Sequence, residues 1–410
     1  MLTPVSLLIA LFFGLVAIAI PVAGALLLWL AFRRPKHIVP AERIQESPDP
    51  ARKRERERSA HRPAQVRLVP WREHLGKTSV LSALVMGVFL LLLPLGFGRA
   101  LVQHSFPAAA DEPHALIGGV QDLKRPDGTK IHVEVFGADN SPQLVLTHGW
   151  SMTSSEWFYA KKQLAGRFRL IVWDLPGLGQ TEQPKNNSDS LEQMAADLDQ
   201  VLSVAQGKPV VLVGHSIGGM TNLTLAKLHP ERFGSQVKGI VQVDTTYTNP
   251  VKTTSNSRLN LALQKPVAEP ILNLMIPFSP LVQFVSRISY REGILNLENA
   301  KSSFAGTESR GQVDLVSRLQ VQASPAVVAR GTLAMFHWDA SATLPQISVP
   351  VLLLVGAEDT TTIPGASATM QRSIPHGRMQ LIEAGRHYAL LERNEAVDDA
   401  IAEFAESLLR

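Results

Sequence analysis

The 410-residue sequence contains no cysteine. Without a thiol, the chain can form no disulfide, no thiolate metal site and no cysteine nucleophile. Aromatic residues make up only 6% and charged residues only 19%, whereas hydrophobic residues make up 45%. That apolar fraction is ordinary for a folded core, so the composition excludes a wholly disordered chain. The length allows one large domain with extra segments, or two domains.

The chain also lacks a strong net charge. It carries +4 at pH 7, and the excess is local because residues 33–77 hold thirteen Lys and Arg against six Asp and Glu, a local charge of +7. The rest of the chain therefore carries −3, which excludes a generally basic nucleic-acid binder, and we expect no nucleic-acid partner. The sequence shows no glycine-rich phosphate loop, nucleotide fingerprint or metal-ligand cluster. We therefore expect neither a cofactor nor a metal ion.

Side-chain charge is absent from the first 32 residues, most of which are Leu, Ala, Ile, Val, Phe and Gly. About 20 apolar residues cross a bilayer core as a helix, so residues 1–32 predict a first transmembrane helix. A cleaved secretory signal is the alternative, although this run is long and lacks a charged N-terminal region. A second uncharged run, Thr78–Gly98, predicts a second transmembrane helix over residues 78–103. A buried helix of a soluble domain is the alternative there.

The basic loop at residues 33–77 predicts the orientation of this anchor. Short loops rich in Lys and Arg stay in the cytoplasm. We therefore expect a cell-membrane protein with two spans, whose N-terminus and whose residues after about 104 lie outside the cytoplasm. In a bacterium, that compartment is the periplasm.

After a linker at residues 104–114, residues 115–410 predict one domain of alternating strands and helices. A first strand is predicted over Lys130–Phe136. Continuous apolar runs then predict strands buried on both faces of a parallel sheet. These runs are Gln143–Thr147, Leu170–Trp173, Val210–Val213, Gly239–Val243, Val351–Val355 and Met379–Ile382. Amphipathic helices are predicted at Ser190–Ala205, Gly218–Leu228 and Asn394–Leu409. This alternation indicates an α/β fold, with a mostly parallel sheet and helices on both of its faces.

One interval of about a hundred residues interrupts the alternation. Residues 247–347 contain no convincing buried strand and read as several helices separated by Pro and Gly. We interpret them as a helical cap inserted before the strand Val351–Val355. Such a cap would cover the carboxyl edge of the sheet, where α/β proteins bind their ligands.

The segment Gly214-His215-Ser216-Ile217-Gly218 follows a predicted strand and opens a predicted helix. In that context G-x-S-x-G indicates a nucleophile elbow. The turn is so tight that its flanking side chains must be very small, which explains Gly214 and Gly218. Ser216 then lies at a helix N-terminus, where the helix dipole favours developing negative charge. We interpret His215 as a residue that packs inside the elbow.

A serine hydroxyl needs a base, and that base needs an orienting carboxylate. His387 follows the last predicted strand, so it should lie at the same sheet edge as Ser216. Asp359 follows the strand Val351–Val355 at that edge and is the predicted acid. Asp244, after Gly239–Val243, is a competing acid, whereas Glu358 should point elsewhere.

The oxyanion formed during acyl transfer needs preorganised N–H donors. One predicted donor is the backbone N–H of Ile217, directly after the nucleophile. The other is the backbone N–H of Trp150, in the loop after Gln143–Thr147. The Trp150 indole would either wall an acyl-binding site or simply pack.

These residues together make the chain from about 115 to 410 resemble the α/β-hydrolase superfamily, specifically its capped serine members. The order Ser216, Asp359, His387 matches the order of nucleophile, acid and histidine in that family, and His148-Gly149-Trp150 resembles its oxyanion loop. The turn Asp174–Thr181 resembles the family's D-x-x-G-x-G-x-S turn with Thr181 in place of the serine, and we interpret Asp174 as structural. The segment from Val349-Pro350 to Asp359 resembles the strand that delivers the acid. The two N-terminal runs fall outside the resemblance.

The nucleophile narrows the activity that the resemblance implies. Haloalkane dehalogenase and epoxide hydrolase relatives carry aspartate at the elbow, so Ser216 argues against both. The HGGPG loop of proline iminopeptidase relatives is missing as well. Hydrolysis of a carboxylic ester, thioester or amide heads the remaining activities. C–C bond hydrolysis and cofactor-free perhydrolase chemistry use the same three residues and remain alternatives, as does a non-catalytic binding domain.

The predicted cap contains an unusually apolar stretch, from Pro270 to Val285. It would pack on the sheet and on neighbouring cap helices, or line an apolar acyl-binding site, or touch the membrane. We therefore expect a small, hydrophobic acyl substrate. The sequence predicts a membrane-anchored serine hydrolase.

Overall fold

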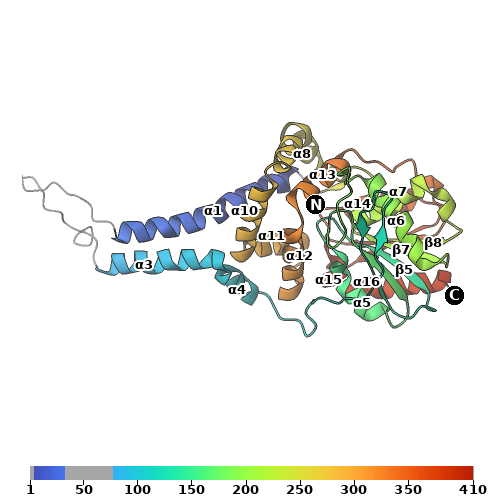
Figure 1. Ribbon diagram of the computed structural model, residues 1–410, viewed down its shortest axis with the longest axis horizontal. Coiled ribbons are helices and arrows are strands. Elements are labelled where there is room, and N and C mark those ends of the chain that lie inside the picture. The colour runs from blue at the N-terminus through green and yellow to red at the C-terminus, as the bar shows by residue number, and fades with distance from the viewer. Residues whose placement is uncertain (1–3, 33–76, 410) are drawn as a thin grey trace, which may run out of the picture. The chain divides into compact units, whose positions relative to one another are not determined.

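The computed structural model describes residues 4–32 and 77–409 (Figure 1). The predicted basic loop, residues 33–77, thus lies outside the described residues except for Lys77. The chain divides into two compact units, one made of Ile18–Leu95 and the other of Met1–Ala17 with Gly96–Arg410. The second unit contains the hydrolase-like domain.

The two apolar runs near the N-terminus differ in the structure. Helix α1 spans Pro4–Phe32, and its segment Leu7–Phe32 is long and apolar enough to cross a membrane. The second run forms α3 (Lys77–Leu92) and a 3₁₀ turn, then bends by 84° at Gly96 into α4 (Phe97–His104). Gly96 has a φ of 105°, which side chains other than glycine rarely adopt. The single helix predicted over residues 78–103 is therefore broken, and a two-span anchor is not confirmed.

Within the unit of residues 18–95, α1 and α3 approach closely through glycines. A Cβ atom on Gly24 would lie 2.9 Å from the Gly87 carbonyl oxygen, and one on Gly87 would lie 2.9 Å from the Leu28 side chain. Small residues permit this backbone approach, which is the usual way that apolar helices pair in a membrane.

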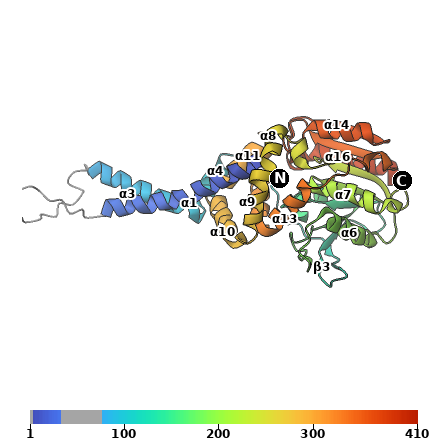
Figure 2. The same ribbon diagram turned by 90° about the horizontal axis from the view of Figure 1, so that it is seen from above.

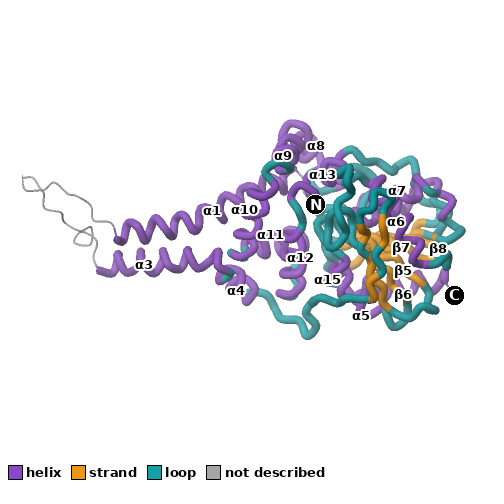
Figure 3. Tube along the Cα trace, viewed as in Figure 1, coloured by secondary structure: helices purple, strands orange, loops and turns teal. Residues whose placement is uncertain are grey.

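A sheet forms the centre of the large domain (Figure 3). It has eight strands in the order β1-β4-β6-β5-β7-β8-β9-β10. The strands β5 to β10 pair in parallel, whereas β4 pairs with β1 and β6 in antiparallel fashion. A separate ribbon pairs β2 with β3. The strands are β1 (Gly119–Val120), β2 (Leu123–Lys124), β3 (Lys130–Ile131), β4 (Val133–Phe136), β5 (Gln143–Thr147), β6 (Arg169–Trp173), β7 (Val210–His215), β8 (Val237–Val243), β9 (Val351–Gly356) and β10 (Gly377–Ile382).

Helices cover both faces of this sheet (Figure 2). Alternate strand residues such as Val145, Leu212 and Leu353 pack with α6 (Leu191–Val201), α7 (Ile217–Leu228) and α14 (Pro364–Ser373). The residues between them, such as Leu146, Val213 and Leu354, pack with α5 (Phe158–Leu164) and α16 (Asn394–Leu409). This two-sided burial requires apolar residues along the whole strand. The predicted mostly parallel α/β fold is confirmed.

The predicted strands match the observed ones closely, with two differences. The strand predicted over Lys130–Phe136 divides at His132 between β3 and β4, which belong to different sheets. The strand predicted at Met379–Ile382 is present as β10, but most of its side chains are exposed or half-buried. It is the edge strand, so the prediction that it is buried on both faces is wrong.

The interval between β8 and β9 is helical, as predicted. Its only described bridge joins Thr248 to Asp339, at the two ends of the interval. The cap helices are α8 (Ser257–Leu263), a π-helical turn (Gln264–Ala268), α9 (Glu269–Met275), α10 (Ser279–Arg291), α11 (Ile294–Ser303), α12 (Arg310–Gln322) and α13 (Pro325–Phe336). Short 3₁₀ turns flank the cap at Pro250–Thr253 and Leu344–Gln346.

Candidate active site

Ser216 lies in the sharp turn between β7 and α7. Its backbone has φ 51° and ψ −118°, a strained conformation for a residue with a side chain. The turn holds because the Ser216 N–H donates to Val243 O at 3.0 Å and the Thr245 hydroxyl donates to Ser216 O at 2.5 Å. A Cβ atom on Gly214 would overlap Gly218, and one on Gly218 would overlap the backbone of Thr147. The flanking glycines are therefore required for close packing, as the sequence predicted.

The structure brings Ser216, His387 and Asp359 together from three different strand ends. His387 Nε2 lies 3.2 Å from Ser216 Oγ, and His387 Nδ1 lies 3.0 Å from Asp359 Oδ2. The exposed fractions are 3% for Ser216, 4% for His387 and 2% for Asp359. The geometry is that of a nucleophile hydrogen-bonded to a base, which is itself oriented by a carboxylate.

The surroundings of Asp359 keep its carboxylate ionised. Its Oδ1 accepts backbone hydrogen bonds from Thr361 at 2.7 Å and Thr362 at 3.1 Å, and its Oδ2 accepts from the Thr362 hydroxyl at 2.6 Å. Burial alone would raise the pKa of Asp359, but the charge of His387 and these hydrogen bonds hold it below its usual value. Burial lowers the pKa of His387, which Asp359 opposes without reversing. His387 is therefore a free base at neutral pH, ready to accept a proton.

The competing acid, Asp244, occupies a different position. Its Oδ1 accepts a hydrogen bond from the Gly356 N–H at 2.7 Å, and its Oδ2 has no hydrogen-bond partner among the described residues. Burial and the neighbouring charge of Asp359 raise the pKa of Asp244 well above its usual value. Because His387 Nδ1 contacts Asp359, the geometry favours Asp359 over Asp244 as the orienting carboxylate.

The loop after β5 carries Trp150, one of the two predicted oxyanion donors. His148 fixes this loop, because its Nε2 accepts from the Leu175 N–H at 3.0 Å while its Nδ1 lies 2.7 Å from Gly149 O. Burial lowers the pKa of His148, which suits a neutral ring that donates from Nδ1 and accepts at Nε2. Within residues 77–409, the backbone N–H groups of Trp150 and Ile217 have no protein acceptor, so both are free to bind an oxyanion.

Sequence reasoning missed a buried ion pair that joins the elbow to this loop. His215 directs Nδ1 at Glu156 Oε1, 3.0 Å away, and Nε2 at the carbonyl oxygen of His387, 2.8 Å away. Glu156 Oε2 accepts the Gly149 N–H at 2.7 Å. Burial would raise the pKa of Glu156, but the neighbouring His215, His148 and Gly149 N–H together hold it below its usual value.

This pair connects three loops and fixes their positions relative to one another. Glu156 fixes the oxyanion loop at Gly149, and His215 fixes the backbone of His387. The sequence interpretation of His215 as a packing residue was therefore incomplete. Its neighbour Ser216 gave a local signal, but Glu156 lies about 60 residues earlier and has no motif of its own.

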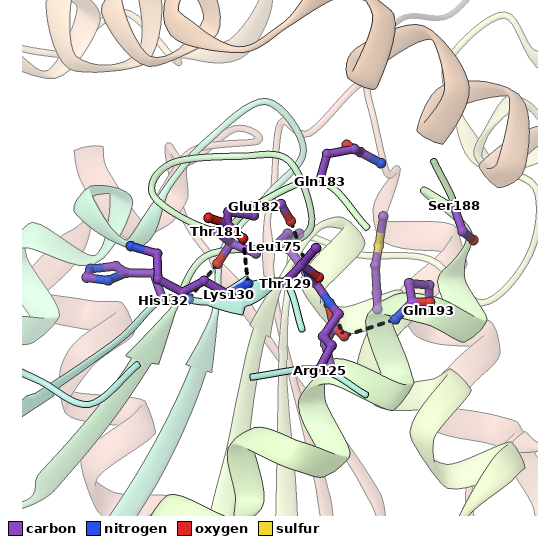
Figure 4. Close-up of polar contacts among 12 residues, drawn as sticks. Arg125, Thr129, Lys130, His132, Leu175, Thr181, Glu182, Gln183, Ser188 and Gln193 are labelled. Atoms are coloured by element: carbon purple, nitrogen blue, oxygen red, sulfur yellow. Dashed lines mark hydrogen bonds and ion pairs between the residues drawn. The ribbon is translucent and has the colours of Figure 1, made fainter. Parts of the chain in front are cut away.

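Asp174 is structural, as predicted from its turn. Its carboxylate accepts the N–H groups of Ser154 at 2.6 Å and Gln180 at 2.8 Å. Thr181 stands where the family's turn has serine, and its hydroxyl accepts the His132 N–H at 2.9 Å (Figure 4). Threonine keeps the one hydroxyl that this contact requires.

Arg125 fixes the end of the turn that contains Asp174 and Thr181 (Figure 4). Its guanidinium forms a bidentate, buried contact with Asp197 of α6, at 2.8 and 2.7 Å, and also donates to Glu182 O at 2.9 Å. Bidentate pairing of this kind is geometrically specific. The turn beside the oxyanion loop is therefore held from the β2–β3 ribbon and from α6.

The cap closes over this centre through contacts with the active-site loops. The Trp150 indole donates to Val328 O of α13 at 3.2 Å, so its side chain packs on the cap. Arg330 of the same helix pairs with Asp189 at 2.6 Å. Phe304, at the end of α11, stacks on Tyr388, the residue after the active-site histidine. These contacts explain why the three reactive side chains are so well buried.

The apolar stretch from Pro270 to Val285 is only partly packed. Leu272 is fully buried in a cluster of cap residues, whereas Leu274, Phe278, Leu281 and Phe284 are exposed on the outer surface. The interpretation that the stretch packs on the sheet and the cap therefore does not hold for those four side chains, and the acyl-binding and membrane alternatives stay open for them. In residues 4–32 and 77–409 no group of three or more His, Asp or Glu side chains is arranged to hold a metal ion.

Comparison with known proteins identifies the family. A family model described as alpha/beta hydrolase fold matches residues 142–394, more than half of the chain. The chain belongs to the α/β-hydrolase family. A relative of this α/β hydrolase, the pimeloyl-[acyl-carrier protein] methyl ester esterase of Nitrosomonas europaea, is 30% identical over 283 residues, which cover 64% of this chain and 94% of the relative. The esterase of the same name from Xanthomonas axonopodis is 26% identical over 284 residues, covering 68% of this chain and 100% of the relative.

Solved structures show the same fold. An esterase from Exiguobacterium antarcticum has a TM-score of 0.58 at 22% identity, covering 71% of this chain and all of that one. A bromoperoxidase from Bacillus anthracis has a TM-score of 0.56 at 19% identity, covering 70% of this chain and all of that one. The family and its ester-cleaving relatives identify this α/β hydrolase as a serine ester hydrolase. Both apolar N-terminal runs lie before the matched residues.

Proposed function

We propose that this α/β hydrolase is a membrane-anchored enzyme that cleaves a carboxylic ester through an acyl-enzyme on Ser216. The observation that carries the proposal is the hydrogen-bonded series Ser216 Oγ, His387 Nε2, His387 Nδ1 and Asp359 Oδ2, with distances of 3.2 and 3.0 Å. A serine without such a base is a weak nucleophile. We assign Ser216 as the nucleophile, His387 as the general base and acid, and Asp359 as the orienting carboxylate.

In the first half of the reaction, Ser216 Oγ attacks the ester carbonyl carbon while its proton moves to His387 Nε2. The carbonyl oxygen becomes an oxyanion, and we assign the N–H groups of Ile217 and Trp150 as its donors. The Asp359 carboxylate stabilises the imidazolium that forms. The bond to the alcohol oxygen then breaks, and His387 gives that oxygen the proton. An alcohol leaves and the acyl group stays on Ser216.

In the second half, water replaces the alcohol. His387 takes a proton from the water, and the resulting hydroxide attacks the acyl carbon to give a second oxyanion in the same place. The bond to Ser216 Oγ breaks, and His387 returns the proton to that oxygen. The carboxylic acid leaves, and no external oxidant, reductant or cofactor is needed.

We propose that the substrate is an alkyl ester of an apolar acyl chain. Support comes from the buried reactive centre beneath an apolar cap, and from relatives whose name specifies a pimeloyl methyl ester. An apolar site gains binding with each methylene, so kcat/KM for p-nitrophenyl octanoate is expected to exceed that for the acetate by at least about tenfold. A chain-length series from acetate to octanoate measures this. Equal or faster turnover of the acetate would contradict an apolar acyl site.

We also propose that both apolar N-terminal runs span the membrane and place the catalytic domain outside the cytoplasm. Support comes from the length of Leu7–Phe32, the close approach of Gly24 and Gly87, and the basic residues at 33–77. A phosphatase reporter that works only in the periplasm is expected to be active when fused after Arg410. The matched fusion after residue 58 is expected to be inactive. An inactive fusion at Arg410, with activity at residue 58, would reverse the orientation.

A further inference from the structure

The outer surface of the cap collects most of the exposed large apolar side chains of the catalytic domain. Between residues 105 and 410, four such side chains are scattered, at Ile117, Val120, Leu228 and Leu381. Seven lie within one segment of the cap, and they are Leu259, Leu261, Leu274, Phe278, Leu281, Phe284 and Leu297. Scattered apolar residues need no explanation, whereas a group of this size marks an interaction surface.

The centre of this surface is the junction between α9 and α10. Phe278 precedes α10 and is 52% exposed, and Leu281 and Phe284 follow at a spacing of three residues on the same side of the helix, 58% and 60% exposed. Ser289 of α10 is buried instead. The segments Ser257–Met275 and Ser279–Arg291 are together apolar enough for a membrane span but bend by 96°. A bent, amphipathic pair suits the membrane interface better than the bilayer core.

The charges around these apolar residues are mostly basic. From Ser257 to Arg291 the chain contains four basic residues, Arg258, Lys265, Arg287 and Arg291, and all four are exposed. The one acidic residue, Glu269, is half-buried and accepts a hydrogen bond from Gln264. This surface is therefore both apolar and basic, although the chain outside residues 33–77 is acidic overall. Basic residues beside exposed apolar side chains favour an anionic lipid surface.

The same cap is joined to the apolar N-terminal helix. Leu7, near the start of α1, is only 3% exposed and belongs to the cap cluster that contains Leu272 and Phe336. A Cβ atom on Gly14 would lie 3.2 Å from the Val285 side chain of α10. A segment that enters a membrane thus packs directly on the two helices, α9 and α10, that carry the exposed apolar residues.

Helix α4, which follows the second apolar run, also packs on the cap (Figure 1). Arg99 pairs with Asp314 at 2.8 Å and donates to the Tyr290 hydroxyl at 3.2 Å. A Cβ atom on Gly98 would overlap the backbone of Glu292. The start of the first apolar run and the segment after the second both contact the cap. A hairpin of two spans brings these two segments to the same side of a membrane, and so brings the cap to its surface.

We propose that the cap surface from Ser257 to Arg291 binds the surface of an anionic lipid bilayer. Phe278, Leu281 and Phe284 enter the boundary between headgroups and acyl chains, and the flanking Arg and Lys side chains contact the lipid phosphates. This contact is additional to the N-terminal helices. It holds the cap, and therefore the entrance to the buried site, against the lipid. The statement about the entrance to the buried site rests on the proposed function, whereas the lipid contact itself does not.

The absence of cysteine makes a direct test straightforward. The full-length chain is prepared as Phe284→Cys and as the matched control Leu228→Cys, whose side chain is 42% exposed on α7, outside the cap. An environment-sensitive fluorophore is attached to each introduced thiol. Both proteins are placed in nanodiscs of phosphatidylcholine with phosphatidylglycerol, with and without a nitroxide quencher on the lipid headgroup. Because both positions are exposed, neither substitution should disturb folding.

Quenching at position 284 is expected to be at least threefold stronger than at position 228, with a blue-shifted emission. Adding Arg287→Glu and Arg291→Glu is expected to reduce that quenching to the level at position 228. Equal quenching at both positions would overturn the proposal, and so would self-quenching that depends on protein density rather than on lipid nitroxide, which would indicate contact between copies of the chain. Hydrolysis of soluble p-nitrophenyl acetate is measured on the same samples. Its absence would contradict the proposed function and leave the lipid result standing.

Discussion

Replacing the Ser216 hydroxyl by hydrogen, in Ser216→Ala, is expected to lower kcat for p-nitrophenyl esters by about 10⁴- to 10⁶-fold. The reason is that the acyl-enzyme cannot form without Oγ, and only the oxyanion donors and binding remain to assist direct attack by water. KM is expected to change little, because the substrate loses no large contact. Reaction with a fluorophosphonate probe, which traps activated serines, is expected to disappear as well.

The matched control is Ser407→Ala. Ser407 is exposed on α16, and its hydroxyl donates only to the Phe404 carbonyl oxygen, at 2.7 Å. Full activity and full probe labelling are expected for this variant. Ser216→Ala with more than a few per cent of normal kcat, in a protein that melts at the normal temperature, would exclude Ser216 as the nucleophile. No labelling of folded wild-type protein would favour a non-catalytic role.

The second large effect is expected for Asp359→Asn. An amide in this position presents a donor to His387 Nδ1 or offers a much weaker acceptor, so the imidazole adopts the wrong tautomer and its charged form loses its partner. A loss of about 10⁴-fold in kcat is expected by analogy with other enzymes that use the same three groups. The Thr361 and Thr362 hydrogen bonds to the remaining oxygen should preserve the local fold.

Asp244→Asn provides a control on a carboxyl equally buried and close by. Burial and the neighbouring Asp359 raise the pKa of Asp244, so its charged form is disfavoured, and an amide oxygen can still accept the Gly356 N–H. A change of less than about tenfold in kcat is expected, since the acid that orients the histidine is untouched. Steady-state kinetics of both variants decide the assignment. A larger loss in Asp244→Asn than in Asp359→Asn would make Asp244 the acid.

The sequence was sufficient to predict the sheet because burial on both faces leaves a local pattern. Gln143–Thr147 was predicted as it is observed, and Asn394–Leu409 matches α16. The exposure of β10 could not be predicted in the same way. Its residues favour a strand, but its place at the edge depends on which strands pair with it. The sequence of one strand does not determine the order of the strands in the sheet.

The proximity of the three candidate-site residues was predictable because each follows a strand, and strand ends of a parallel sheet share one edge. Ser216, Asp359 and His387 were found in this way. Glu156 and Thr362 were not, because each acts through buried hydrogen bonds to residues of the candidate site, and no sequence spacing encodes those contacts.

The N-terminal region shows a different limit. The long uncharged run predicted one helix over residues 78–103. Hydropathy carries no information on the backbone conformation, and Gly96 adopts a left-handed conformation that ends the helix. Likewise, the apolar residues of the cap were visible in the sequence, whereas the side of the cap that they occupy depends on helix packing. Only the structure separates Leu272, which is buried, from Phe284, which is exposed.

The depth of Ser216 beneath the cap has a kinetic consequence. With Ser216, His387 and Asp359 all at most 4% exposed, the contacts of Trp150 with Val328 and of Arg330 with Asp189 are expected to open before an ester reaches the nucleophile. Each turnover therefore includes an opening and a closing step, and the slower of these competes with acyl transfer to set the rate. For such a gated enzyme, kcat is expected to fall as solvent viscosity rises.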